Sequence, residues 1–195
     1  MKKYIVTAIV VVALAALGLG YYFYTANKTP ASDATDTAAS SSNSEVATLT
    51  SRDLSLNYPE SPRDLIKLYA RITKAYYATE LTADEITALG KQARLLFDDE
   101  LLASQTEKDF FEKLNEEISA YRSANMYISD YKIESAANVN YTTFKERNYA
   151  SIKLVYYIRE DSTLHNSYTK FTLRKDSSGH WKILYWELVD ETVIE

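Results

Sequence analysis

The sequence contains no cysteine, and only 4 glycines and 3 prolines occur among its 195 residues. The lack of cysteine excludes a disulfide framework and thiolate chemistry within this sequence. No run of basic residues occurs, and the net charge is −5. The chain therefore lacks the basic patch by which proteins bind nucleic acids. Aromatic side chains are abundant instead, with 17 Tyr, 6 Phe and 2 Trp, so we expect the folded part to be stabilised by packing.

Few residues suit catalysis or metal binding. The 2 histidines, His165 and His180, lie next to predicted turns, where we expect exposed side chains. No pattern with the ligand spacing of a metal site occurs. Asp98, Asp99 and Glu100 are adjacent, but on a helix their side chains point in different directions, which favours a solvated surface. We therefore expect no metal, no cofactor and no catalytic residue.

An apolar run over residues 4–24 contains no charged residue and follows Lys2 and Lys3. A membrane-spanning helix needs about 20 such residues, so the run predicts a transmembrane helix preceded by a cytoplasmic stub, residues 1–3. The positive-inside rule places the following chain outside the cell. A cleaved signal peptide is the alternative, but the run is longer than a signal core of ~7–15 residues, and the bulky residues 21–24 suit cleavage poorly. We expect an uncleaved signal anchor in the cell membrane of a bacterium.

Residues 25–50 consist mainly of Ser, Thr, Ala, Asn and Asp. They show no periodic apolar face that could repay the entropy lost on ordering, which predicts a disordered tether. Residues 51–195 are long enough for one domain with its own core. We expect this domain to be extracellular.

Three amphipathic helices with capping signals are predicted at the start of the domain. Ser61, Thr82 and Thr106 are the expected N-caps, for helices over about 62–79, 82–102 and 106–121. Gly90 either weakens the second helix or marks a close helix crossing.

The second half of the domain is rich in β-branched and aromatic residues, separated by short polar turns. Strands are predicted over 126–134, 139–144, 149–159, 164–175 and 181–190. Short connections require antiparallel pairing. Helices followed by strands predict an α+β fold, in which three helices pack on a curved antiparallel sheet.

This order of elements resembles the NTF2-like (cystatin-like, SnoaL-like) superfamily, whose members form a cone from helices and a bent antiparallel sheet. The segment Gly179-His180-Trp181-Lys182-Ile183 is similar to the G-x-W-x-I ending common in that superfamily. Residues 51–77, 92–102 and 173–190 more closely resemble an uncharacterised family of single-pass membrane-anchored proteins of Gram-positive anaerobes. The first resemblance implies a cone with an internal pocket. The second implies no activity.

Alternation along residues 149–159 separates two faces of the sheet. The face with Ala150, Ile152 and Leu154 should contact the helices, and the opposite face should carry an aromatic patch of the kind that marks an interaction surface. Candidates for this partner face are Tyr149, Tyr157, Tyr168 and Trp186. A bulge that exchanges the faces, or a segment that covers them, is the alternative.

Three functions follow from these expectations. The first, which we favour, is a membrane-tethered binding or assembly module without catalysis that docks a second copy or another envelope protein. The second is a small-ligand or sensory pocket in the cone, lined by Tyr69, Tyr76, Ile152, Tyr156 and Trp181. The third is a pocket enzyme of isomerase or hydratase type. A buried carboxyl with a shifted pKa facing the pocket would favour the third function.

Overall fold

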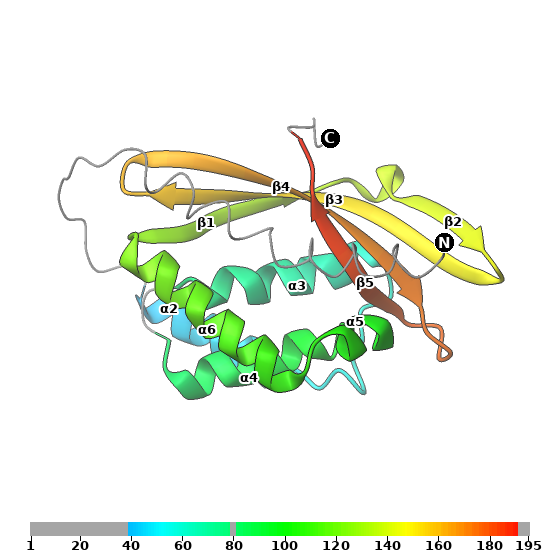
Figure 1. Cartoon of the computed structure of the whole chain (residues 1–195), viewed down its shortest axis with the longest axis horizontal. Helices are drawn as coiled ribbons and strands as arrows, with labels where there is room; N and C mark the ends of the chain where they lie inside the picture. The colour runs from blue at the N-terminus through cyan, green and yellow to red at the C-terminus, as the bar shows by residue number, and fades with distance from the viewer. Residues whose placement is uncertain (1–38, 79–80, 191–195) are drawn as a thin grey trace, which may run out of the picture.

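The computed structural model describes residues 39–78 and 81–190. Figure 1 shows the helices gathered on one face of a curved sheet, which is the α+β arrangement that the sequence predicts. No helix within the described ranges is long and apolar enough to cross a membrane. The predicted span at residues 4–24 lies outside the described residues, as do the stub and the first part of the predicted tether.

The three predicted N-caps are confirmed. Ser61, Thr82 and Thr106 each accept a hydrogen bond from the backbone N–H three residues further on, which satisfies a donor that the first helical turn leaves unpaired. The helices that follow these caps are α3 (Pro62–Tyr76), α4 (Ala83–Arg94) and α6 (Glu107–Ser123).

The predicted second helix is divided in the structure. After α4, Leu96 and Asp98 exchange backbone hydrogen bonds of 2.8 Å with Ile183, so residues 96–98 run along the edge of the sheet. A short helix, α5 (Asp99–Ser104), then begins at the N-cap Asp98. The predicted second helix stops after α4 because the backbone groups of Leu96 and Asp98 form hydrogen bonds with Ile183 of β5 instead of continuing the helix.

The second part of the predicted tether forms a helix, which corrects that prediction. Helix α2 (Ala39–Thr50) packs against α3 and α4. Val46 and Leu49 lie one helical turn apart and are buried in the core. Glu45 forms an ion pair with Arg71 of α3, with an N–O distance of 2.7 Å. Tertiary contacts thus stabilise a segment whose composition alone indicates disorder.

The five predicted strands are confirmed with small shifts in their ends. They are β1 (Met126–Ile133), β2 (Asn140–Phe144), β3 (Arg147–Glu160), β4 (Thr163–Lys175) and β5 (Trp181–Leu188). All pairings are antiparallel in the order β1-β3-β4-β5, and β2 pairs with the first part of β3. A 3₁₀ turn (Ala136–Asn138) connects β1 to β2.

The helix side of β3 is the predicted one. Ala150, Ile152, Leu154, Tyr156 and Ile158 are all buried in one core with α3 and α6. In β5 the alternation changes, because Leu173 pairs with Ile183 whereas Thr172 pairs with Tyr185. The extra residue places both Ile183 and Trp186 on the helix side.

Gly90 marks a close helix crossing, as one of its two interpretations predicts. A Cβ at this position would lie 2.3 Å from a ring carbon of Phe111 on α6. Glycine therefore allows α4 and α6 to approach closely, although it lowers the intrinsic stability of α4.

Candidate functional site

A cavity of about 140 Å³ lies between the helices and the last strand. Helices α3, α5 and α6 supply most of its wall, and Trp186 of β5 closes one side. The lining residues are Tyr69, Thr73, Tyr76, Tyr77, Leu101, Ser104, Gln105, Asp109, Phe110, Lys113, Leu114, Glu117 and Trp186.

Aromatic rings form the floor of the cavity. The Tyr69 ring lies 5.8 Å from the Trp186 ring and 5.6 Å from that of Phe171. Phe97 lies 5.9 Å from both Tyr69 and Phe110. Such tilted and edge-to-face pairs are attractive and hold the rings in fixed positions. The rings of Tyr69, Phe110 and Trp186 in the cavity wall thus pack against Phe97 and Phe171 behind it.

Tyr76 lines the cavity and carries a hydroxyl without a hydrogen-bond partner among the described residues. The side chain is buried. A buried hydroxyl without a partner is unfavourable, and its desolvation raises the pKa of Tyr76 well above the usual range. The hydroxyl oxygen has almost no accessible surface, so the ring of Tyr76 rather than its hydroxyl faces the open part of the cavity.

Glu117 on α6 is the second unusual polar group. Burial raises the pKa of this carboxyl to about 8, and a hydrogen bond from the Tyr77 hydroxyl offsets part of that rise. The Tyr77 ring in turn packs against that of Tyr121 in a tilted arrangement, with 4.2 Å between the ring centroids. Near neutral pH, Glu117 is therefore mostly protonated.

The raised pKa of Glu117 makes the stability depend on pH. In the unfolded chain the carboxyl ionises near 4.5, whereas in the folded protein it keeps its proton to about pH 8. The folded state therefore loses stability as pH rises from about 5 to 8, by up to ~1.4 kcal/mol per pH unit, and the loss is constant above pH 8. We expect Glu117→Gln to remove this dependence and to raise the free energy of unfolding at pH 8.5 by up to about 4 kcal/mol.

Urea denaturation at pH 5, 6.5 and 8.5 measures this effect. Glu116→Gln is the matched control, because Glu116 is the exposed neighbour on the same helix. If wild type and Glu117→Gln lose stability in parallel over this range, the assignment of the raised pKa to Glu117 is wrong.

The cavity contains two of the five residues predicted for it, Tyr69 and Tyr76. Ile152, Tyr156 and Trp181 are buried but do not line it. The Tyr156 hydroxyl also lacks a hydrogen bond of good geometry among the described residues. Trp181 packs instead against Tyr141, at the end of the sheet that carries β2.

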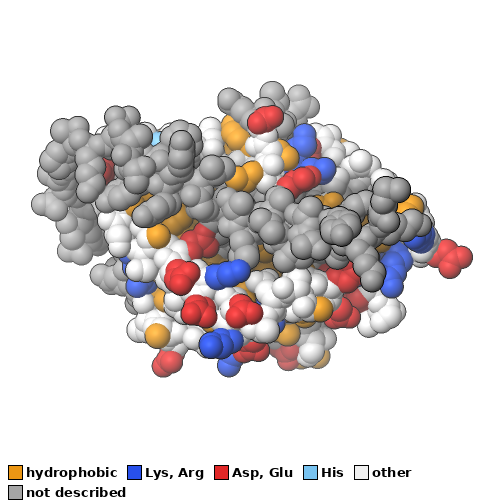
Figure 2. Space-filling view, viewed as in Figure 1, with side chains coloured by type: hydrophobic (Ala, Val, Ile, Leu, Met, Phe, Trp, Pro, Cys, Tyr) orange, Lys and Arg blue, Asp and Glu red, His pale blue; other side chains and the backbone are white. Residues whose placement is uncertain are grey.

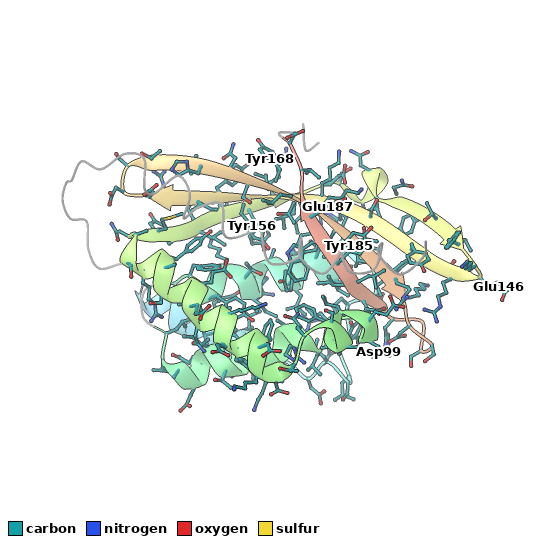
Figure 3. All side chains as sticks on the ribbon, in the orientation of Figure 1. Asp99, Glu146, Tyr156, Tyr168, Tyr185 and Glu187 are labelled. Carbon is teal, nitrogen blue, oxygen red and sulfur yellow. The ribbon has the colours of Figure 1, made fainter. Side chains whose placement is uncertain are left out.

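Three of the four residues predicted for the partner face lie on the predicted side of the sheet. Tyr149, Tyr157 and Tyr168 lie on the side of the sheet away from the helices, and Figure 3 shows Tyr168 on that side and Tyr156 on the other. All three are partly buried. The placement of Trp186 on this face is wrong, because the bulge turns it into the cavity.

The acidic triplet corrects another expectation. Asp98 is not on a solvated surface: it is buried and forms a bidentate ion pair with Arg174 of β4. Glu100 accepts a further hydrogen bond of 2.7 Å from Arg174. Within the described part of the chain, no group of acidic or histidine side chains is arranged to hold a metal ion.

A second hollow of about 370 Å³ lies on the opposite face of the sheet. It is a shallow depression lined by strand residues such as Asn140, Thr142 and Ser151. The cavity beside Glu117 is the better candidate site, since it combines enclosure, aromatic walls and unusual polar groups.

The spacing of Glu117 from apolar residues of α6 is a sequence signal that predicts its position beside the cavity. Glu117 follows Leu114 by three residues and precedes Tyr121 by four, so it lies on the apolar face of α6. An acidic residue at such a position is placed against the interior. Figure 2 shows the other charges of both signs spread over the visible helical surface.

A family model described as a domain of unknown function, DUF6715, matches residues 1–186. No curated protein matches the chain.

Proposed function

The chain belongs to the DUF6715 family, and we propose that its domain binds a small molecule in the cavity between α3, α5, α6 and β5. The carboxyl of Glu117, which lines the cavity and has no ion-pair partner among the described residues, carries this proposal. A titratable group with a strongly shifted pKa in a pocket indicates a functional site. Cavities with apolar walls and few polar groups are also the usual sites of small ligands.

The cavity weakens the alternative that we favoured from the sequence, a docking module. Trp186, one of the four residues expected on the partner face, contributes to the cavity instead. A docking face formed by Tyr149, Tyr157 and Tyr168 stays a prediction for a homodimer or an envelope protein partner. Both functions are compatible with the NTF2-like cone that we propose for this arrangement of helices and sheet.

A second candidate is a pocket enzyme that transfers a proton, of isomerase or hydratase type. The raised pKa of Glu117 favours it, because general acid–base catalysis is most effective when the pKa of the group lies near ambient pH. Conversion of a bound compound, followed by NMR, would distinguish this enzyme from a binding protein.

We also propose that the domain is held outside the cell by the apolar run at residues 4–24. The evidence is the length of the run and the lysines before it. A reagent that cannot cross the membrane should then label the domain in intact cells.

Ligand-detected NMR on the full-length protein tests the binding function. The panel consists of single-ring and short-chain compounds of neutral, anionic and cationic type, because a cavity of this volume holds about one ring. We expect at least one compound to bind wild type. Leu114→Trp should abolish binding, because Leu114 lines the cavity and the larger side chain would fill it.

Two tyrosine variants form a matched pair. Tyr76→Phe and Tyr121→Phe each remove a buried hydroxyl, but only Tyr76 lines the cavity. Because the Tyr76 hydroxyl has almost no accessible surface, we expect both variants to keep the affinity of wild type to within about 3-fold, whereas Leu114→Trp should abolish it. If no compound gives a signal that Leu114→Trp removes, the proposal fails.

A further inference from the structure

Glu117 lacks the partner that a desolvated carboxylate requires. Among the described residues, no lysine, arginine or histidine forms an ion pair with it. Lys113 lines the same cavity one turn earlier on α6 but is exposed, and it does not lower the pKa of Glu117. A desolvated acidic group without a cation stays neutral unless a positive charge arrives from outside.

The walls around this carboxyl suit a positive charge. Tyr69, Tyr76, Tyr77, Phe110 and Trp186 all line the cavity. Aromatic faces attract ammonium groups, most strongly where water is excluded, and several rings together form the usual receptor for alkylated ammonium ions. The same rings pack well against an apolar ring or short alkyl chain.

We propose that the ligand is a small organic cation, an ammonium group on a single ring or short alkyl chain, whose charge lies against Glu117 and whose apolar part lies among the aromatic rings. This inference rests on the proposed binding function. The volume of about 140 Å³ is close to the 150 Å³ that holds a benzene ring in an engineered cavity. Asp109 and Lys113 are exposed, so the cavity opens to solvent beside them.

An anionic ligand is the alternative to a cation. The change of affinity with pH distinguishes the two. A cation pairs with ionised Glu117, so its affinity should rise with pH. An anion accepts hydrogen bonds from protonated Glu117 and is attracted by Lys113, so its affinity should fall. The other titratable and charged groups around Glu117 are Tyr69 and Tyr76 of α3, Tyr77 directly after that helix, and Asp109, Lys113 and Tyr121 of α6; among the described residues, α5 and β5 contribute none to the lining.

The test compares benzylammonium, benzyl alcohol and benzoate, which share one shape and differ in charge. Full-length Trp181→Phe protein contains a single tryptophan, Trp186, in the cavity wall, so its fluorescence reports binding there. We expect benzylammonium to bind at least about 10-fold more tightly than either of the other two. Its affinity should rise roughly 10- to 20-fold from pH 6.5 to pH 8.5, since Glu117 ionises with a pKa of about 8.

Two variants test whether the carboxyl of Glu117 causes the preference for the cation and the pH dependence of its affinity. In the same background, Glu117→Gln should remove both the preference for the cation and its pH dependence. Asp109→Asn, which removes the exposed carboxylate at the opening, should keep both. If Asp109→Asn rather than Glu117→Gln removes them, the cation lies at the opening and the inference is overturned.

The outcomes also separate this inference from the binding function. If benzoate or benzyl alcohol binds as tightly as benzylammonium, or if the affinity of the cation falls with pH, the cation inference fails and the binding function stands. If none of the three compounds binds, and the NMR panel gives no signal that Leu114→Trp removes, both fail together.

Discussion

Replacing Asp98 with alanine is expected to lower the free energy of unfolding by about 3–5 kcal/mol, because it leaves the charge of Arg174 buried without its main partner. The exposed fractions of the two side chains are 8% for Arg174 and 5% for Asp98, so water cannot replace the lost carboxylate. Glu100 retains one hydrogen bond to Arg174, but its own side chain is 67% exposed. For a domain of this size the melting temperature should fall by roughly 10 °C.

Two further variants separate the roles of Asp98. Its carboxylate also caps α5 by accepting a hydrogen bond of 2.9 Å from the backbone of Glu100. Asp98→Asn keeps a capping oxygen but removes the charge, so we expect it to lose most of the same stability. Asp99→Ala is the control, since Asp99 is exposed on the first turn of α5 (Figure 3) and should change stability by less than about 0.5 kcal/mol.

Replacing both partners tests the mechanism of this effect. Asp98→Leu combined with Arg174→Met removes both charges, and we expect it to be more stable than either single variant. If Asp98→Ala is no more harmful than Asp99→Ala, the ion pair between Asp98 and Arg174 does not stabilise the fold. Calorimetry of the full-length protein provides the measurement.

The elements that the sequence predicts correctly are specified by residues that lie close together in the chain. The N-caps at Ser61, Thr82 and Thr106 satisfy donors within their own first turns, so the pattern is complete in four residues. The β3–β4 connection is equally local: Glu160 pairs with Thr163 across a turn in which Asp161 has φ of 50°. Such signals predict the element order and the α+β fold without knowledge of tertiary contacts.

The expectations that failed depend on contacts between distant segments. Asp98 reads as a helix surface residue until Arg174, 76 positions later, is placed beside it. Trp186 reads as an outward residue until the bulge in β5 shifts the alternation. A strand pattern fixes which residues share a face only while the register is regular. The cavity was therefore predicted as a feature of the fold, but only Tyr69 and Tyr76 of its walls were identified.

Helix α2 is the clearest case of tertiary contacts overriding composition. Its twelve residues contain only two large apolar side chains, Val46 and Leu49, and a helix of this length is marginal by itself. Three contacts hold it in place: the burial of these side chains, the Glu45–Arg71 ion pair, and a hydrogen bond of 3.1 Å from Gln92 to the carbonyl of Thr50. Each partner lies in α3, α4 or the core.

The second large effect is therefore expected at Leu49. Leu49→Ala should lower the free energy of unfolding by about 2–5 kcal/mol, because Leu49 is only 1% exposed and its truncation leaves a space in the core. A leucine in a disordered tether would have no effect when replaced. The matched control is Thr48→Ala, since Thr48 is exposed on the same helix and bonds only to the carbonyl of Ser44.

Urea denaturation of full-length variants shows whether residues 39–50 are a folded helix of the domain or part of a disordered tether. A loss at Leu49 well above that at Thr48 would show that the folded domain begins before residue 51, so fragments for binding studies must include α2. Equal and small losses would mean that α2 contributes no stability and that the tether extends to Thr50, as its composition indicates. Because α2 packs on α3 and α4, and α3 carries Tyr69 and Tyr76 of the cavity wall, this result also decides whether a shortened protein is a fair test of ligand binding.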